Sequence, residues 1–91
     1  MMKKVYDWDN QKNWKLIKER NISFEAIVSL VESGNIIAIA VGKGKFAHQK
    51  QFIVEMNKYI YIVPFVEDDQ KIFLKTIISS RKLTKKFLSG G

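Results

Sequence analysis

The sequence has no cysteine, which excludes disulfides, thiolate metal sites and cysteine nucleophiles, and is consistent with a reducing cytoplasm. With one histidine, a metal site would have to be built from carboxylates, and no serine–histidine–aspartate arrangement follows from spacing. The longest apolar run, Ile36–Val41, is far short of the roughly 20 residues needed to cross a bilayer. The first ten residues carry charges and aromatics where a secretion signal needs an apolar stretch. We therefore expect a cytoplasmic protein with no metal, no cofactor and no membrane partner.

Negative charge is also scarce. The chain carries 16 lysines and arginines against 9 acids, for a net charge of +7. The last acid is Asp69, and only cations follow it among the charged residues, namely Lys71, Lys75, Arg81, Lys82, Lys85 and Lys86. A polyanion, an acidic protein or a membrane surface is the usual partner of such a protein. A lysine-rich protein that is merely soluble has the same composition, so charge alone leaves nucleic acid as one of two interpretations.

The 91 residues are enough for one small domain, residues 1–91, with no internal repeat or linker. Residues 3–8 are typical of a short edge strand, after which Asp9 is placed to cap a helix over residues 10–20. Trp14 and Ile17 would form the apolar face of this helix, with Leu16 beside them. A second amphipathic helix is expected to begin after Ser23 and to end near Gly34.

The remaining sequence is typical of strands followed by a short helix. Alternating apolar residues predict strands over residues 35–41, 51–56, 59–66 and 71–79. Asn57-Lys58 fits a two-residue hairpin turn, and Pro64 indicates an edge position or a bulge. Residues 81–88 suit a helix capped by Ser80. The predicted fold class is α+β, with a small antiparallel sheet of about four strands packed against two N-terminal helices and a short C-terminal helix.

The cationic C-terminal segment has two interpretations. On a helix, Lys82, Lys85 and Lys86 share one face while Leu83 and Phe87 share another, so the helix could dock by one side and present cations on the other. Arg81 lies at the junction of strand and helix, where free backbone N–H groups also favour an anion. This spot could hold a phosphate. The alternative is a solvated, positively charged end of the chain.

Three motifs follow one another along the chain: Trp8-Asp9, then Ser23-Phe24-Glu25, then the segment Ile77–Thr84 with the sequence IISSRKLT. Together, in this order, they resemble the BrnT family of toxins from type II toxin–antitoxin systems. The resemblance extends from Tyr6 to about Leu88. It implies a RelE-like fold, with RNA held over the sheet. It also implies a ribonuclease that cleaves RNA and is inhibited by a cognate antitoxin protein, the pair binding operator DNA only through the antitoxin.

RNA cleavage without a metal requires a base for the 2′-hydroxyl, an acid for the leaving oxygen, and cations for the charge that builds on the phosphate. His48 is the candidate for proton transfer, with an ordinary surface histidine as the alternative. Arg81 is the candidate for stabilising the phosphate, with Arg20 as a third catalytic candidate. We expect Lys12, Arg20 and Arg81 to share one surface with the further RNA-binding candidates Lys50, Lys75, Lys82, Lys85 and Lys86.

Each of these assignments competes with a structural role. Arg20 could instead pair with Glu19 or Glu25. Trp8 and Trp14 are better interpreted as core residues than as base-stacking platforms, and Tyr59 and Tyr61, which share a sheet face, fit cross-strand packing better than stacking on RNA. Two rival functions also remain: a non-catalytic nucleic-acid-binding module, and a protein-interaction domain whose lysines only keep it soluble.

Overall fold

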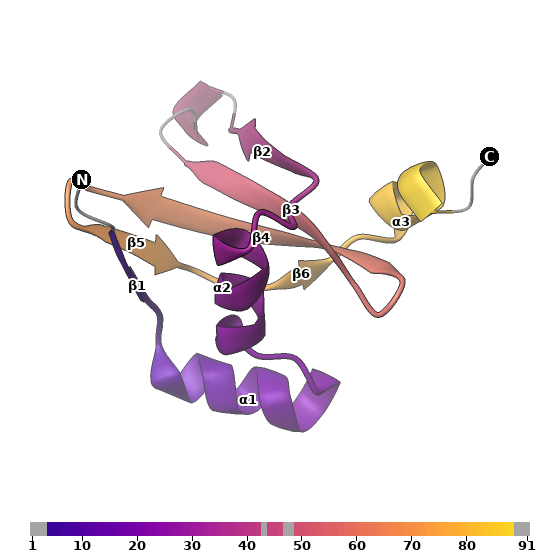
Figure 1. Cartoon of the computed structure of the whole chain (residues 1–91), viewed down its shortest axis with the longest axis horizontal. Helices are drawn as coiled ribbons and strands as arrows, with labels where there is room; N and C mark the ends of the chain where they lie inside the picture. Colours follow the sequence, from indigo (N-terminus) through magenta and orange to yellow (C-terminus); the bar gives the residue numbers. More distant parts are fainter. Residues whose placement is uncertain (1–3, 43, 47–48, 89–91) are drawn as a thin grey trace.

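The computed structural model describes residues 4–42, 44–46 and 49–88 (Figure 1). The elements follow one another as β1 (Val5–Asp7), α1 (Asn10–Arg20), α2 (Phe24–Glu32), β2 (Ala38–Val41), the 3₁₀ helix η1 (Gly44–Phe46), β3 (Lys50–Met56), β4 (Tyr59–Glu67), β5 (Lys71–Leu74), β6 (Ile78–Ser79) and α3 (Arg81–Leu88). The predicted α+β class, with two N-terminal helices and a C-terminal helix, is confirmed. Of the helices within the described residues, none is long and apolar enough to span a membrane.

The sheet is larger than predicted, and it is mixed. Its strands run in the order β1-β5-β4-β3-β2, and β6 pairs separately with β4. All pairs are antiparallel except β1 with β5, which lie parallel with Val5 opposite Lys71. The prediction of a purely antiparallel sheet of about four strands is wrong in these two details. Alternation of apolar residues gives no strand direction, and β1 pairs with a strand that is distant in the sequence.

The predicted strand over residues 71–79 is divided into β5 and β6 by a bulge opposite Pro64. Leu74 faces Phe65 and Ile78 faces Ile62, so the three residues 75–77 lie opposite the two residues 63–64. The carbonyl of Pro64 still accepts a hydrogen bond from the N–H of Lys75, at 2.8 Å. Because proline has no N–H to return, pairing is interrupted there. Pro64 is therefore beside a bulge in an interior strand, and its edge-strand interpretation is wrong.

Local signals in the sequence placed most element ends correctly. The Asp9 carboxylate accepts hydrogen bonds from the N–H groups of Gln11 and Lys12, and the Ser23 hydroxyl caps α2 through the N–H of Ala26. The β3–β4 hairpin turns at Asn57 and Lys58, which have φ angles of 56° and 61°. Positive φ at both central residues is the geometry of a type I′ turn, which matches the twist of the strands. Asn57-Lys58 is thus the predicted hairpin turn.

The main core lies between the sheet and helices α1 and α2. Phe24 and Ile27 of α2 are fully buried against a sheet face that includes Val54, Val63 and Leu74. Since burial of one such side chain contributes roughly 1.5–3 kcal/mol, this layer holds the helices on the sheet. Trp8 stacks on Phe24 at a ring-centroid distance of 5.7 Å and packs against the core, as predicted.

The predicted apolar face of α1 does not point inward. Trp14 is 66% exposed and Ile17 is 36% exposed, whereas Asn13 and Leu16 are buried. The core interpretation of Trp14 is therefore wrong. The helix is rotated so that Asn13 meets the start of α2, where its side chain accepts a hydrogen bond from the N–H of Phe24 and donates one to Glu25, both at 2.8 Å.

Candidate nucleic-acid interface

A cationic hollow of about 310 Å³ lies between α1 and the segment that joins β5 to β6. We call it the α1 groove. The residues that line it are Lys12, Lys15, Leu16, Glu19, Arg20, Thr76, Ile77 and Ile78. Its helical residues follow the spacing i, i+3, i+4, i+7 and i+8, which is one stripe along α1. The stripe places three cations and one carboxylate beside a strand segment that contributes apolar side chains.

A hydrogen bond ties Lys12 to the far wall of the groove. Its ammonium donates to the backbone carbonyl of Lys75 at 3.3 Å. Lys75 itself is exposed at the bulge, directly before the groove residue Thr76. Lys12 and Lys75 are therefore close together, as predicted. The contact is between the Lys12 ammonium and the Lys75 backbone, and not between the two side chains.

Arg20 joins the α1 groove to a second hollow of about 310 Å³, which is lined by Arg20, Tyr59, Tyr61 and Ser79. The two tyrosine rings are half-buried and lie 5.7 Å apart, tilted by 51°. In the part of the chain that the structure describes, no carboxylate pairs with Arg20, and Glu25 bonds to Asn13 instead. The guanidinium is thus exposed and available between the groove and two aromatic side chains.

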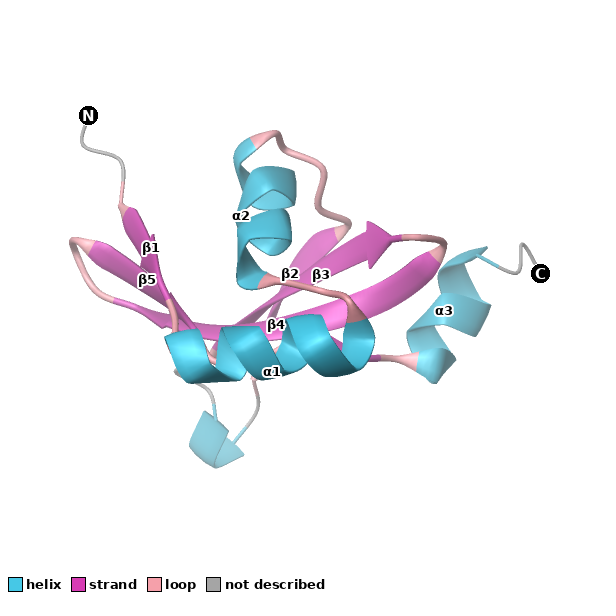
Figure 2. Cartoon of the chain, turned by 90° about the horizontal axis from the view of Figure 1, so that it is seen from below, coloured by secondary structure: helices cyan, strands magenta, loops and turns pink. Residues whose placement is uncertain are grey.

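The C-terminal cations lie on α3, which begins two residues after Ser79. Figures 1 and 2 both place α3 on the side of the molecule toward which α1 runs. The Ser80 hydroxyl accepts a hydrogen bond from the N–H of Leu83 at 3.2 Å, which confirms Ser80 as the cap and puts Arg81 in the first turn. Arg81, Lys82, Lys85 and Lys86 are all exposed, and the Lys86 ammonium lies 5.7 Å from the Phe87 ring centroid. Arg81 lies two residues after Ser79, which lines the second hollow, but Arg81 itself does not line it.

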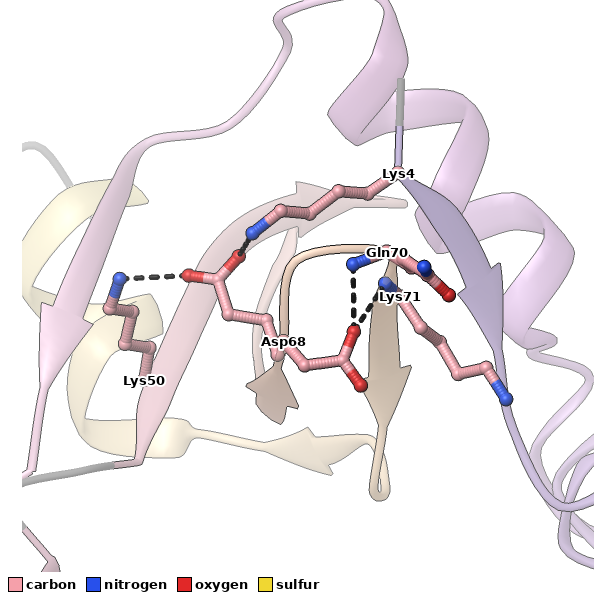
Figure 3. Close-up of polar contacts among 6 residues, drawn as sticks. Lys4, Lys50, Asp68, Gln70 and Lys71 are labelled. Atoms are coloured by element: carbon pink, nitrogen blue, oxygen red, sulfur yellow. Dashed lines mark hydrogen bonds and ion pairs between the residues drawn. The ribbon is translucent and has the colours of Figure 1, made fainter. Parts of the chain in front are cut away.

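One predicted site residue, Lys50, is not brought into this surface. Lys50 begins β3 and forms an ion pair with Glu67 at 2.8 Å, while Lys4 binds the other oxygen of Glu67 at 2.7 Å (Figure 3). These lysines hold the pKa of Glu67 below its ordinary value, because their hydrogen bonds favour the carboxylate. Lys50 lines a different hollow, which shares no residue with the α1 groove. His48 lies outside the described residues.

The other perturbed groups belong to the same end of the sheet. Backbone N–H groups of Gln70 and Lys71 donate to Asp68 at 2.8 Å and lower the pKa of its carboxyl group (Figure 3). Burial, reinforced by Glu32 and Glu67, raises the pKa of Tyr6. These pKa shifts reflect turn geometry, ion pairing and burial, and none of the shifted groups lies in the α1 groove.

Lys15 and Glu19 are groove residues that the sequence did not single out. Among the described residues, Glu19 is the one carboxylate that lines the groove. Asn13 sets the rotation of α1 through its hydrogen bonds to α2. This rotation turns Glu19 toward Ile78 of β6, which lines the same groove. No group of three or more histidine, cysteine or acidic side chains within the described residues could hold a metal ion. The chemistry available here is that of cations, one carboxylate and two phenols.

Comparison with known proteins yields a structural likeness only. No family model and no curated protein sequence matches this chain. A similar solved structure is the crystal structure of a YafQ mutant from E. coli, with a TM-score of 0.52 and 12% sequence identity. The match covers 89% of this chain and 98% of that chain. It confirms the RelE-like α+β fold expected from the sequence.

Proposed function

We propose that this chain is a toxin of the BrnT type that cleaves RNA without a metal ion and is neutralised by a cognate antitoxin protein. The observation that carries the proposal is the α1 groove, which is lined by Lys12, Lys15, Glu19 and Arg20 and adjoins a hollow with two tyrosines. The fold, which is similar to that of the YafQ toxin, supports it. Operator DNA would be bound only through the antitoxin.

The groove offers a carboxylate and cations, which are two of the three kinds of group that this cleavage requires. Glu19 is the candidate base that removes the proton from the ribose 2′-hydroxyl. Arg20 would bind the phosphate oxygens, because a guanidinium can donate two parallel hydrogen bonds to them as negative charge develops. Lys12 and Lys15 would hold neighbouring phosphates along the strand, and Arg81 at the start of α3 would hold another.

The aromatic hollow suggests that the substrate is single-stranded. Tyr59 and Tyr61 are side by side on the same sheet face, where an unstacked base could lie against a ring. An RNA strand would then run from the α1 groove past Arg20 to the tyrosines. His48, which lies outside the described residues, stays a predicted candidate for proton transfer.

The test is cleavage of single-stranded RNA by the purified chain in the presence of a chelator. Arg20→Ala should lower the cleavage rate by about 10²- to 10³-fold, the effect of removing one donor to a developing oxyanion. Glu19→Gln should lower it by about 10²- to 10⁴-fold, because the base is lost while the shape is kept. Arg81→Ala and His48→Ala test the two remaining candidates in the same assay.

Lys18→Ala is the matched control, since Lys18 is an exposed cation on α1 that lines neither hollow. It should leave the rate unchanged. Full activity in both Arg20→Ala and Glu19→Gln would refute the groove as the active site. Binding of RNA without cleavage would favour the non-catalytic module, and absence of RNA binding at low salt would leave a protein-interaction domain.

A further inference from the structure

The outer edge of β2 is an unpaired strand edge. β2 ends the strand order and pairs with β3 alone in the described part of the chain (Figure 1). The N–H of Gly42 donates to the carbonyl of Gln49 at 2.8 Å, so Gly42 faces β3. Ala40 and Ala38 lie two and four residues earlier, opposite Gln51 and Ile53, and therefore also direct their backbone groups toward β3. Because antiparallel pairing alternates, the N–H and C=O groups of Ile39 and Val41 point away from β3. Within the described residues, this edge therefore presents backbone donors and acceptors that no other strand pairs with.

The same edge lacks the features that normally protect one. Edge strands usually carry lysine or proline, whereas β2 has the sequence Ala-Ile-Ala-Val. Ile39 is 53% exposed and Val41 is 59% exposed, and their spacing of two puts both on one face of β2. An uncovered apolar edge of this kind favours the addition of another strand.

An apolar hollow of about 230 Å³ adjoins this edge. Ile39 lines it together with Val31 and Ile36 on the α2 side and Phe52 and Phe65 from the sheet. Such a hollow can receive one apolar side chain of a strand lying against β2. It shares no residue with the α1 groove, so the two surfaces can be altered separately.

Charge indicates what kind of strand would bind. Residues 33–54 contain three lysines and no acid. Lys50 is opposite Val41 in the β2–β3 pair, and together with Lys4 it holds the single carboxylate Glu67 at the rim of the hollow (Figure 3). If a second copy of this chain bound here, its lysines would lie close to Lys4 and Lys50, and the like charges would repel one another. An acidic segment would have its charge matched.

We propose that the outer edge of β2 binds an extended, acidic segment of a partner protein as an additional strand, with one apolar side chain of that segment in the Ile39 hollow. The identification of this partner with the neutralising antitoxin rests on the proposed function. The binding surface itself does not, because it is argued from the edge, the hollow and the lysines.

The experiment uses a synthetic octapeptide of alternating valine and glutamate, and follows amide hydrogen exchange by NMR. At saturating peptide, the Ile39 and Val41 amides should exchange at least about tenfold more slowly, because they gain hydrogen-bond partners. The Ala38 and Ala40 amides, which face β3, should change little. A peptide with lysine in place of glutamate should bind at least about tenfold more weakly.

Val41→Pro removes one outward N–H without removing a β2–β3 hydrogen bond, so it should abolish peptide binding and leave RNA cleavage unchanged. Val41→Thr, which keeps the N–H and the branched shape, should still bind. Saturation without protection of Ile39 and Val41 would overturn the proposal, as would no peptide binding by a folded chain. Protection that rises with the concentration of the chain alone would also overturn it, in favour of a second copy. Peptide binding by a chain that cleaves no RNA would refute the proposed function and leave the edge site standing.

Discussion

Asn13 is a buried residue that connects α1 to α2 through two hydrogen bonds. It is 6% exposed, its carbonyl oxygen accepts from the N–H of Phe24, and its amide donates to Glu25. In this way a side chain of one helix satisfies a free N–H at the start of the next. The same contact fixes the rotation of α1, and therefore which of its residues face the groove.

We expect Asn13→Ala to lower the free energy of unfolding by about 1–3 kcal/mol, because the buried N–H of Phe24 would lose its acceptor. Chemical denaturation of the variant measures this. Gln11→Ala, an exposed change on the same helix, should cost less than about 0.5 kcal/mol. Equal stability of the two variants would contradict a bridging role for Asn13.

Asn13 also explains why the sequence misled at Trp14 and Ile17. Apolar periodicity assigned these two residues to the inner face, yet a polar residue occupies that face because its hydrogen bonds are satisfied locally. Whether these hydrogen bonds can form depends on where the start of α2 lies relative to α1. The spacing of apolar residues within α1 gives no information about that position. By contrast, Trp8 was correctly assigned to the core, next to Phe24.

Lys58 occupies the left-handed region of the backbone at φ 61°, where a side chain is strained. Lys58→Gly should therefore raise the free energy of unfolding by about 0.5–1 kcal/mol, after the greater flexibility of glycine in the unfolded chain is subtracted. Lys18→Gly, the same change inside α1, should lower it by about 1 kcal/mol. Thermal unfolding compares the two. A loss of stability in Lys58→Gly would contradict the type I′ turn.

At the scale of elements, a small network of hydrogen bonds attaches α3 to the sheet. The N–H of Ser80 donates to the carbonyl of Ile60, and the N–H of Ile60 donates to the Thr84 hydroxyl, both at 2.9 Å. The Thr84 hydroxyl in turn donates to the carbonyl of Ser80 at 2.7 Å. No residue of α3 is fully buried, so this small network carries much of its attachment.

Thr84→Val should loosen α3, because the Ile60 N–H then faces a methyl group in place of an acceptor. We expect a loss of about 1–3 kcal/mol in unfolding free energy and faster amide exchange in residues 83–88. Thr84→Ser keeps the hydroxyl and should preserve the slow exchange. Unchanged exchange in Thr84→Val would mean that apolar packing alone holds α3.

Signals within one element were predictive, whereas contacts between distant elements were not. Caps at Asp9, Ser23 and Ser80 and the turn at Asn57 act over a few residues, so the sequence reveals them. The parallel pairing of β1 with β5 joins residues more than 60 positions apart and leaves no local pattern. The same distinction applies to the candidate site. Helical spacing within α1 predicted that Lys12 and Arg20 share a face, whereas the place of Glu19 in the groove depends on how α1 packs against the segment between β5 and β6.

At the scale of the whole molecule, the proposed sites at the groove and at the β2 edge suit different kinds of partner. The groove and the hollow that it joins at Arg20 combine exposed cations with tyrosine rings, as a surface for a nucleic-acid strand does. The β2 edge combines free backbone groups with an apolar hollow, as a surface for a polypeptide strand does. One segment of a partner protein can therefore bind to the edge while another part of that protein covers the groove. Mutations at either surface should separate the proposed peptide binding from the proposed RNA binding.

The salt dependence of RNA binding tests whether the positive charge acts locally or through its total of +7. With a single-stranded RNA whose 2′-hydroxyls are methylated to prevent cleavage, the slope of log K against log salt reports the number of phosphates neutralised. Lys12→Ala combined with Lys15→Ala should reduce that slope by about 1.4, since each contact with a single strand contributes about 0.7. Lys18→Ala combined with Lys71→Ala removes the same total charge outside the groove and should leave the slope unchanged. Equal reductions in both double variants would mean that RNA is attracted by net charge alone, and would remove the groove as its binding site.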